Sequence, residues 1–262
     1  MSDPAGGPRA TDTPETDLPE ANLLLEEHDE AASALVNLVV VLADNKWFLG
    51  LHTSEWAVGA PVLESSVACA AISQGHMGQA RVLYPLLEEL PSTVSSTPPG
   101  EGGRSRRYAV TALDAPFPTW PRVVAALLLI DGALNTLLGA LRGTGYTPLA
   151  RRVGRMLEDE RFHRDFADGR VRELCTFPRG AELLAAEVDA LLPEMLCWFG
   201  PGDEPGVRAL REEGYVTGDG DVWRAGYLER VLGILGEAGI SPEHEELPWE
   251  RWNHLQRRLN PA

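Results

Sequence analysis

The sequence contains little cysteine, a single lysine and no long cluster of basic residues, and each of these absences excludes a class of protein. Its 262 residues carry a formal net charge of −16, and basic residues gather only in the short run 104–107. Binding of nucleic acid requires a cationic surface that neutralises phosphates, so we exclude nucleic acid as a partner. The three cysteines (Cys69, Cys175 and Cys197) lack CxxC spacing, which argues against a disulfide scaffold and a thiolate metal site.

The sequence also lacks a secretory signal and the common catalytic motifs. Its first residues include no basic stretch followed by an apolar one, so no signal peptide is expected. No GxSxG, P-loop or dinucleotide-binding fingerprint occurs. The apolar run 123–141 resembles a membrane span, but Asp131 lies at its centre, where an Asp costs a membrane helix about 2.5–3.5 kcal/mol. We therefore predict a cytoplasmic protein in which this run is a core helix, with no membrane partner.

Composition divides the chain into three parts. Residues 1–24 are rich in Pro, Thr, Gly and acidic residues and are predicted to form a disordered acidic tail. Residues 25–240 are predicted to form one helical domain, interrupted at 91–117 by a flexible crossover that is rich in Pro and Gly. Residues 241–262 are predicted to form a C-terminal extension.

The pattern within the helical domain predicts an all-α fold, because alternating β-patterns are essentially absent. Two long helices, a long crossover and two more helices are the plan of a ferritin-like four-helix bundle, here with additional C-terminal helices. The helices are expected at about 29–52, 61–90 with a kink or early end at Pro85, 121–143, 147–172, 183–199 and 222–236, and a Gly/Pro-rich turn is expected at 200–206.

Each of the four bundle helices carries one polar layer within an apolar stripe, when the sequence is followed at alternating three- and four-residue steps. Stacked in a bundle, these layers bring six polar side chains into the core: Lys46, His76, Gln79, Asp131, Glu160 and His163. Burial of Asp131 beside Leu127–Ile130 would be costly without a positive partner. Lys46 is the expected partner, because the other 22 basic residues are all arginine and the one ammonium lies on an apolar stripe.

Simpler interpretations remain open for four members of this layer. Lys46 at the surface would extend its ammonium into water. A histidine on an apolar face, such as His76, is more often a hydrogen-bonded core residue than a ligand. The pair Glu160-x-x-His163 lies in a charged segment that fits a solvated helix face equally well.

Several segments of the sequence, in order along the chain, are similar to one known family. They are LADNKWFLG at 42–50, APVLE at 60–64, GQARVLY at 78–84, FPTW at 117–120, EDERFH at 158–163 and MLCWFGP at 195–201. In these segments the chain resembles the phenylacetic acid catabolic protein family, the catalytic and structural ferritin-like subunits of phenylacetyl-CoA epoxidase. The resemblance covers roughly residues 35–240.

The resemblance implies a di-iron site that this chain has partly lost. Catalytic members have a carboxylate on helix one, Glu-x-x-His on helix two, a carboxylate on helix three and Glu-x-x-His on helix four. Lys46 stands at the first position, and His76 and Gln79 stand at the helix-two pair, so three positions depart. Asp131, Glu160 and His163 match. The segment GQAR resembles the structural subunit, whereas FPTW and WFGP resemble the catalytic one, which implies a divergent relative of both.

Two functions follow as alternatives. The first is a non-catalytic structural or binding subunit linked to phenylacetate-type catabolism, with no metal and with a helical protein partner or a second copy of itself. The second is a metal-dependent oxygenase acting on an aryl-CoA or related substrate, with one iron held by His76, Glu160 and His163 and with Asp131 as a fourth ligand or beside them. The resemblance also implies an acyl-CoA ligand.

The remaining cysteine and histidine residues have less specific expectations. Cys197 is expected to be a buried core thiol rather than a nucleophile. The other four histidines lie in polar or terminal segments and are expected at the surface: His28, His52, His244 and His254.

Overall fold

The computed structural model describes residues 29–100, 103–244 and 246–260 of the chain. The predicted acidic tail 1–24 and His28 lie outside the described residues. Within them the protein is mostly helical, and the prediction of an all-α bundle is confirmed.

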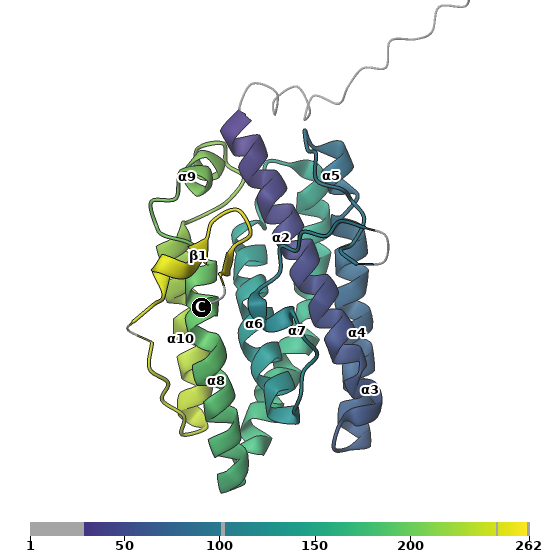
Figure 1. The fold of residues 1–262 in the computed structure, drawn as a ribbon, viewed down its shortest axis with the longest axis vertical. Coiled ribbons are helices and arrows are strands. Elements are labelled where there is room, and N and C mark those ends of the chain that lie inside the picture. Colours follow the sequence, from purple (N-terminus) through teal and green to yellow (C-terminus); the bar gives the residue numbers. More distant parts are fainter. Residues whose placement is uncertain (1–28, 101–102, 245, 261–262) are drawn as a thin grey trace, which may run out of the picture.

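Four long helices lie side by side along the long axis of the molecule (Figure 1): α2 (Asp29–Ser54), α4 (Leu63–Leu83), α6 (Trp120–Ala140) and α7 (Thr147–Leu174). The short helices α3 (Trp56–Gly59) and α5 (Leu86–Glu89) flank α4. The predicted break at Pro85 is present, because α4 ends at Leu83 and Pro85 precedes α5. The start of α6 is fixed by Thr119, whose hydroxyl accepts a hydrogen bond from the backbone N–H of Arg122.

Three further helices cover the bundle: α8 (Pro178–Trp198), α9 (Pro205–Glu212) and α10 (Gly220–Glu237). Helices α8 and α10 pack against α6, and α9 packs against α2. The sequence predicted only a turn near the start of α9. That helix has eight residues and buries only Val207 and Leu210, so its apolar pattern is too short to be recognised from periodicity.

The segment between α5 and α6 is anchored to α2 at two neighbouring residues. Asp44 accepts hydrogen bonds from Tyr84, Arg104 and the backbone N–H of Tyr108. Asn45 bonds to the backbone of Tyr108 and Val110. The segment includes one 3₁₀ helix, η1 (Thr111–Leu113), in its described part.

The C-terminal residues fold back onto the ends of α8 and α9. A 3₁₀ helix, η2 (Trp249–Arg251), precedes a short antiparallel hairpin of β1 (Trp252–Asn253) and β2 (Arg258–Leu259). Arg257, between the two strands, is buried and pairs with Glu204 at the start of α9. This contact joins the C-terminal hairpin to the helical body.

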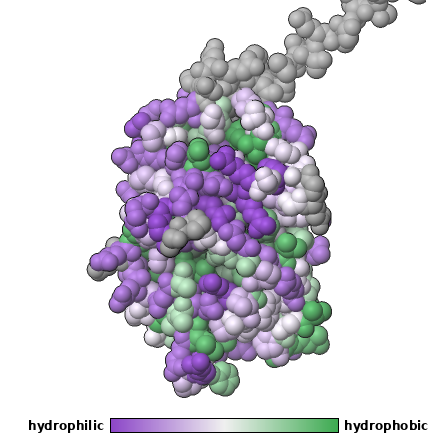
Figure 2. Space-filling model, in the orientation of Figure 1, coloured by the Kyte–Doolittle hydropathy of each residue, from purple (hydrophilic) through white to green (hydrophobic). Residues whose placement is uncertain are grey.

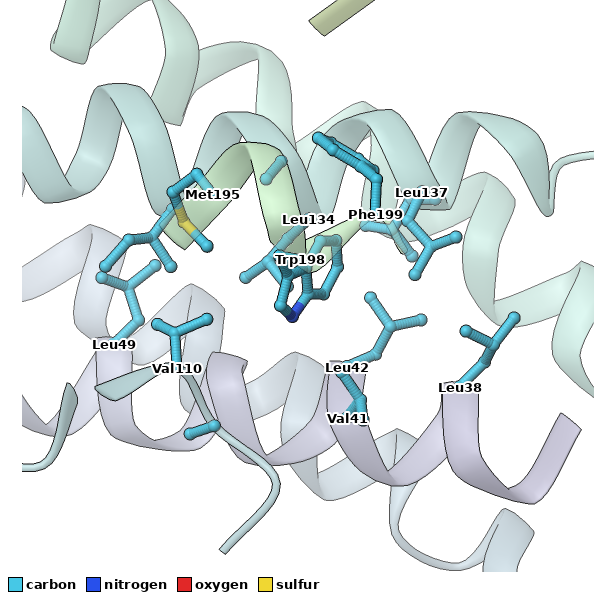
Figure 3. Close-up of a cluster of buried hydrophobic side chains, with 14 of the residues drawn as sticks. Leu38, Val41, Leu42, Leu49, Val110, Leu134, Leu137, Met195, Trp198 and Phe199 are labelled. Atoms are coloured by element: carbon cyan, nitrogen blue, oxygen red, sulfur yellow. The ribbon is translucent and has the colours of Figure 1, made fainter. Parts of the chain in front are cut away.

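The core continues from the bundle to the end of α8. Figure 3 shows Trp198 and Phe199 beside side chains of α2 and α6, including Leu42 and Leu137. All four are fully buried. Because aromatic side chains bury large areas, this contact contributes strongly to holding α8 on the bundle.

Two segments are long and apolar enough to cross a membrane by length and composition: 30–59 and α6. Inside the protein, 78% and 89% of their most apolar windows are buried, as expected of core helices. The face drawn in Figure 2 is mainly hydrophilic, with hydrophobic residues in separate patches.

Candidate functional site

The six polar residues predicted from the stripes lie at the middle of the bundle, and all six are buried. Lys46 comes from α2, His76 and Gln79 from α4, Asp131 from α6, and Glu160 and His163 from α7; the least buried, Gln79, is only 4% exposed. The polar layer, as we call these six residues, is surrounded by apolar residues of the same helices. The distances between the charged atoms of this layer show which of its residues are paired.

Lys46 is the centre of the polar layer. Its Nζ donates to Asp131 Oδ1 and to Glu160 Oε1, at 2.6 Å in both cases, and lies 3.5 Å from His76 Nδ1. The lysine side chain is long enough to cross from α2 to both α6 and α7, and it is 0% exposed. A surface position for Lys46 is therefore wrong for this structure.

The two histidines lie close to the carboxylates that Lys46 contacts, and His163 approaches the same oxygen of Glu160. His163 Nδ1 is 3.3 Å from Glu160 Oε1 and 3.6 Å from Asp131 Oδ2. His76 Nε2 is 3.8 Å from Asp131 Oδ2. The two imidazole rings meet edge to face, with 4.5 Å between their centroids.

Asn135 completes the layer, and the sequence analysis did not assign it to the site. Its Nδ2 donates to Glu160 Oε2 at 2.7 Å and to the backbone oxygen of Asp131 at 3.2 Å. The signal for this contact was its position four residues after Asp131, which places both residues on one face of α6.

Burial and close charges oppose each other in setting the protonation of the carboxylates. Burial raises the pKa of Asp131, but the Lys46 ammonium and His163 outweigh it and hold that pKa below its usual value. Burial and Asp131 raise the pKa of Glu160, and Lys46 and His163 again lower it overall. Burial lowers the pKa of Lys46, whereas the two carboxylates raise it above its usual value. All three groups are therefore charged at neutral pH.

The pKa values of the two histidines are shifted in opposite directions. Burial lowers the pKa of His163, but its contacts with Asp131 and Glu160 raise it to about 9. Burial, together with the nearby Lys46, lowers the pKa of His76. At pH 7 the polar layer thus holds two cations, two anions and a neutral His76, and its net charge is zero.

Several atoms of the layer have no hydrogen-bond partner among the described residues. They are His76 Nε2, His163 Nδ1, Asn135 Oδ1 and both amide atoms of Gln79. Buried polar atoms without partners are rare and costly, so their concentration here distinguishes this layer from an ordinary core.

Four side chains of the layer form a cluster that could hold a metal ion: His76, Asp131, Glu160 and His163, whose candidate ligand atoms all lie within 4.8 Å of one another. A ferritin-like di-metal centre uses six ligands, including carboxylates from all four helices. Here Lys46 Nζ forms ion pairs with one oxygen of Asp131 and one oxygen of Glu160, the two carboxylates of this cluster. The residues present therefore do not fit a di-iron centre.

A comparison of the whole sequence with known protein families identifies the family of this chain. A family model described as phenylacetic acid catabolic protein matches residues 24–257. The chain belongs to the phenylacetic acid catabolic protein family. The predicted resemblance is thus confirmed over nearly the entire chain. No curated protein sequence matches this family member closely.

Outside the polar layer, one expectation was wrong. His52 is buried rather than at the surface, and its Nε2 lies 3.0 Å from the backbone oxygen of Leu113, because η1 folds over this end of α2. His254 is exposed, as expected, and His244 is partly exposed. Cys197 is buried, and burial raises the pKa of its thiol to about 12, which makes it a poor nucleophile.

Proposed function

We propose that this member of the phenylacetic acid catabolic protein family is a non-catalytic structural or binding subunit, linked to phenylacetate-type catabolism. In it, the di-iron site of catalytic relatives is replaced by an ion-pair layer. The observation that carries the proposal is the position of Lys46 Nζ, 2.6 Å from a carboxylate oxygen of both Asp131 and Glu160. The ammonium supplies the positive charge that buried carboxylates require.

Electrostatics favour this layer over a metal centre. With Lys46 and His163 both charged, the layer is already neutral, so a divalent ion would bring uncompensated charge into a buried site. Like charges a few ångströms apart repel strongly in a low-dielectric interior. A metal ion would first have to displace the ammonium from both carboxylates.

A subunit without its own chemistry would act through a partner, either a helical protein or a second copy of this chain. The first part of α4, with α3 before it, supports this role, because it exposes Val58, Leu63 and Val67. These apolar residues are 92%, 75% and 63% exposed, respectively. We place the protein in the cytoplasm, where the catabolism of acyl-CoA compounds takes place, and an acyl-CoA is a candidate ligand.

Elemental analysis of the purified protein tests the proposal. The wild-type chain is expected to contain no stoichiometric iron, even after growth in iron-rich medium. The variant Lys46→Glu/His76→Glu/Gln79→His, which restores the family's ligand types at the departing positions, should gain iron. Two tightly held irons in the wild-type chain would overturn the proposal.

A second candidate function is a metal-dependent oxygenase with a single iron, acting on an aryl-CoA or related substrate. It is favoured by the close approach of His76, Glu160 and His163, since two histidines and one carboxylate are a common ferrous site. Such an iron would activate dioxygen, with electrons from a separate reductase, and the chain's own residues would hold it. Anaerobic titration with ferrous ion separates the cases, because this function requires stoichiometric binding that His163→Ala abolishes.

A further inference from the structure

The outer face of α4 is exposed along the whole helix, and apolar side chains lie at both of its ends. Helix α4 stands at the edge of the molecule (Figure 1), where it packs against α2 and α7. Leu63 and Val67 are exposed near its start, and Val82, near its end, is 44% exposed. A contiguous apolar surface of this kind marks an interaction site more often than an ordinary surface does.

Between these ends the outer face is made mainly of small side chains. Ala70 and Ala71 are exposed, and a Cβ added at Gly78 would meet nothing within 4 Å apart from its own stretch of helix. Gly75 and Gly78 also line a groove of about 1030 Å³ between α4 and α7. Because the distance between packed helices depends on the side chains at their contact, the middle of α4 allows a second helix to approach closely.

This face is complementary to itself when two copies of α4 run antiparallel. With a two-fold axis at the middle of the helix, position 63 of one copy is level with position 82 of the other, and position 67 is level with position 78. Leu63 of one copy then packs beside Val82 of the other, and Val67 enters the open space at Gly78. A two-fold interface requires such a match, because the same patch serves both subunits.

The antiparallel pairing also brings opposite charges together. Glu64 and Arg81 are both exposed, and neither forms an ion pair within the described part of the chain. Since Glu64 follows Leu63 and Arg81 precedes Val82, Glu64 of one copy is level with Arg81 of the other, and each dimer contains two such pairs. A parallel pairing would place each residue beside its own copy, where like charges repel.

Residues of α7 increase the positive charge at the Arg81 end of the face. The groove lining there contains five further charged residues: Arg151, Arg152, Arg155, Glu89 and Asp159. Arg152 pairs with Glu89 at 3.6 Å, so two arginines remain against one carboxylate. This end therefore attracts the Glu64 end of another copy and repels its own counterpart.

We propose that the protein forms a homodimer in which the outer faces of α4 pack antiparallel about a two-fold axis. Leu63 and Val67 of each copy lie against Val82 and Gly78 of the other, and Glu64 pairs with Arg81. The contact extends about 28 Å along the helix, from Leu63 to Val82, at 1.5 Å per residue. The proposal rests on the proposed function, because it names the second copy as the partner of this subunit.

Sedimentation equilibrium of the full-length protein over a range of concentrations tests the dimer. The mass of the wild type should rise toward twice the 28.5 kDa of one chain. Iron is measured on the same samples, so that the two proposals fail separately. A dimer with two irons per chain would overturn only the proposed function, whereas an iron-free monomer would overturn only the dimer.

Charge reversal tests the antiparallel pairing. Glu64→Arg and Arg81→Glu should each raise the dissociation constant of the dimer by about tenfold or more, because each creates two repulsive pairs. Glu64→Arg/Arg81→Glu restores opposite charges and should return the constant to within about threefold of the wild type. Arg208→Glu reverses an exposed arginine of α9 away from this face and is the control, with an unchanged constant.

Filling the space at Gly78 tests the packing. Gly78→Leu should raise the dissociation constant by about tenfold or more, because the leucine takes the space that Val67 of the other copy needs. Leucine favours a helix more than glycine does, so the chain should keep its helix content by circular dichroism. Gly226→Leu, at an exposed glycine of α10 with nothing within 4 Å, is the matched control and should leave the dimer unchanged.

A wild type that stays monomeric at every concentration would overturn the proposal and leave this face to a different protein. A dimer that Gly78→Leu does not weaken would place the interface elsewhere. A double charge variant that dimerises no better than either single variant would rule out the antiparallel pairing. All these positions are at the surface of one copy, so the variants should fold and the masses decide between the outcomes.

Discussion

Lys46 and Arg257 are both buried cations paired with carboxylates, but they differ in how many of the polar atoms around them have hydrogen-bond partners. Arg257 donates from Nε to the backbone oxygen of Trp198, from Nη1 to both oxygens of Glu204, and from Nη2 to the backbone oxygen of Phe199. Each of its nitrogen atoms has a partner. Around Lys46, by contrast, polar atoms of His76, His163 and Gln79 have no hydrogen-bond partner among the described residues, although the two histidines lie 3.3–3.8 Å from the carboxylates.

This difference separates an ion pair that joins two chain segments from a layer that leaves buried polar atoms without hydrogen-bond partners among the described residues. A buried polar atom without a hydrogen bond costs free energy, so the Arg257 cluster is the more completely satisfied of the two. Under the proposed function, Lys46 takes a metal-ligand position of catalytic relatives, and the unpartnered atoms follow from that exchange.

The largest effect is expected from removal of the Lys46 ammonium. Lys46→Met would leave two buried carboxylates, Asp131 and Glu160, with His163 as the one cation of the layer, so the free energy of unfolding should fall by about 3–5 kcal/mol in urea denaturation. In Lys46→Met/Asp131→Asn/Glu160→Gln both carboxylates are gone and burial then keeps His163 neutral, so no buried charge remains unpaired and most of this loss should be recovered. A cost below about 1 kcal/mol for Lys46→Met would contradict the central role of the ammonium.

A pH titration of stability tests the charge of His163. Its pKa in the folded protein is raised to about 9, above the value of about 6.5 in an unfolded chain. Its contribution is therefore fully present below about pH 6.5 and is lost as the pH rises through 9. The difference in unfolding free energy between wild type and His163→Gln should shrink by up to about 3 kcal/mol between pH 6.5 and 9.5. A pH-independent difference would show that His163 is neutral.

Removal of Arg257 should cost less than removal of Lys46. The Glu204 side chain is 14% exposed, so water can partly replace the guanidinium. Arg257→Met is expected to lower the free energy of unfolding by about 2 kcal/mol, mainly through the lost contacts with Glu204 and two backbone oxygens. A cost equal to that of Lys46→Met would remove the contrast between the two cations.

The two clusters also differ in how far the sequence predicts them. The polar layer could be predicted, because Lys46 and Asp131 interrupt long apolar stripes at helical spacing. The Arg257 cluster could not, because Arg257 lies in a polar segment and its burial depends on a hairpin with a positive φ of 47° at that residue. The burial of His52 was missed for the same kind of reason, since it depends on η1, which is distant in sequence.

The smallest and most discriminating effect concerns Gln79. Replacement of an unpartnered buried amide by a side chain of similar size without polar atoms removes a desolvation cost, so Gln79→Leu should raise the free energy of unfolding by about 1 kcal/mol. Thermal and urea denaturation of the ligand-free protein measure this change, with Arg208→Gln as the neutral control. A loss of stability would mean that Gln79 has a structural partner, as Arg257 does. A gain would mean that the folded protein keeps the Gln79 amide at a cost in stability.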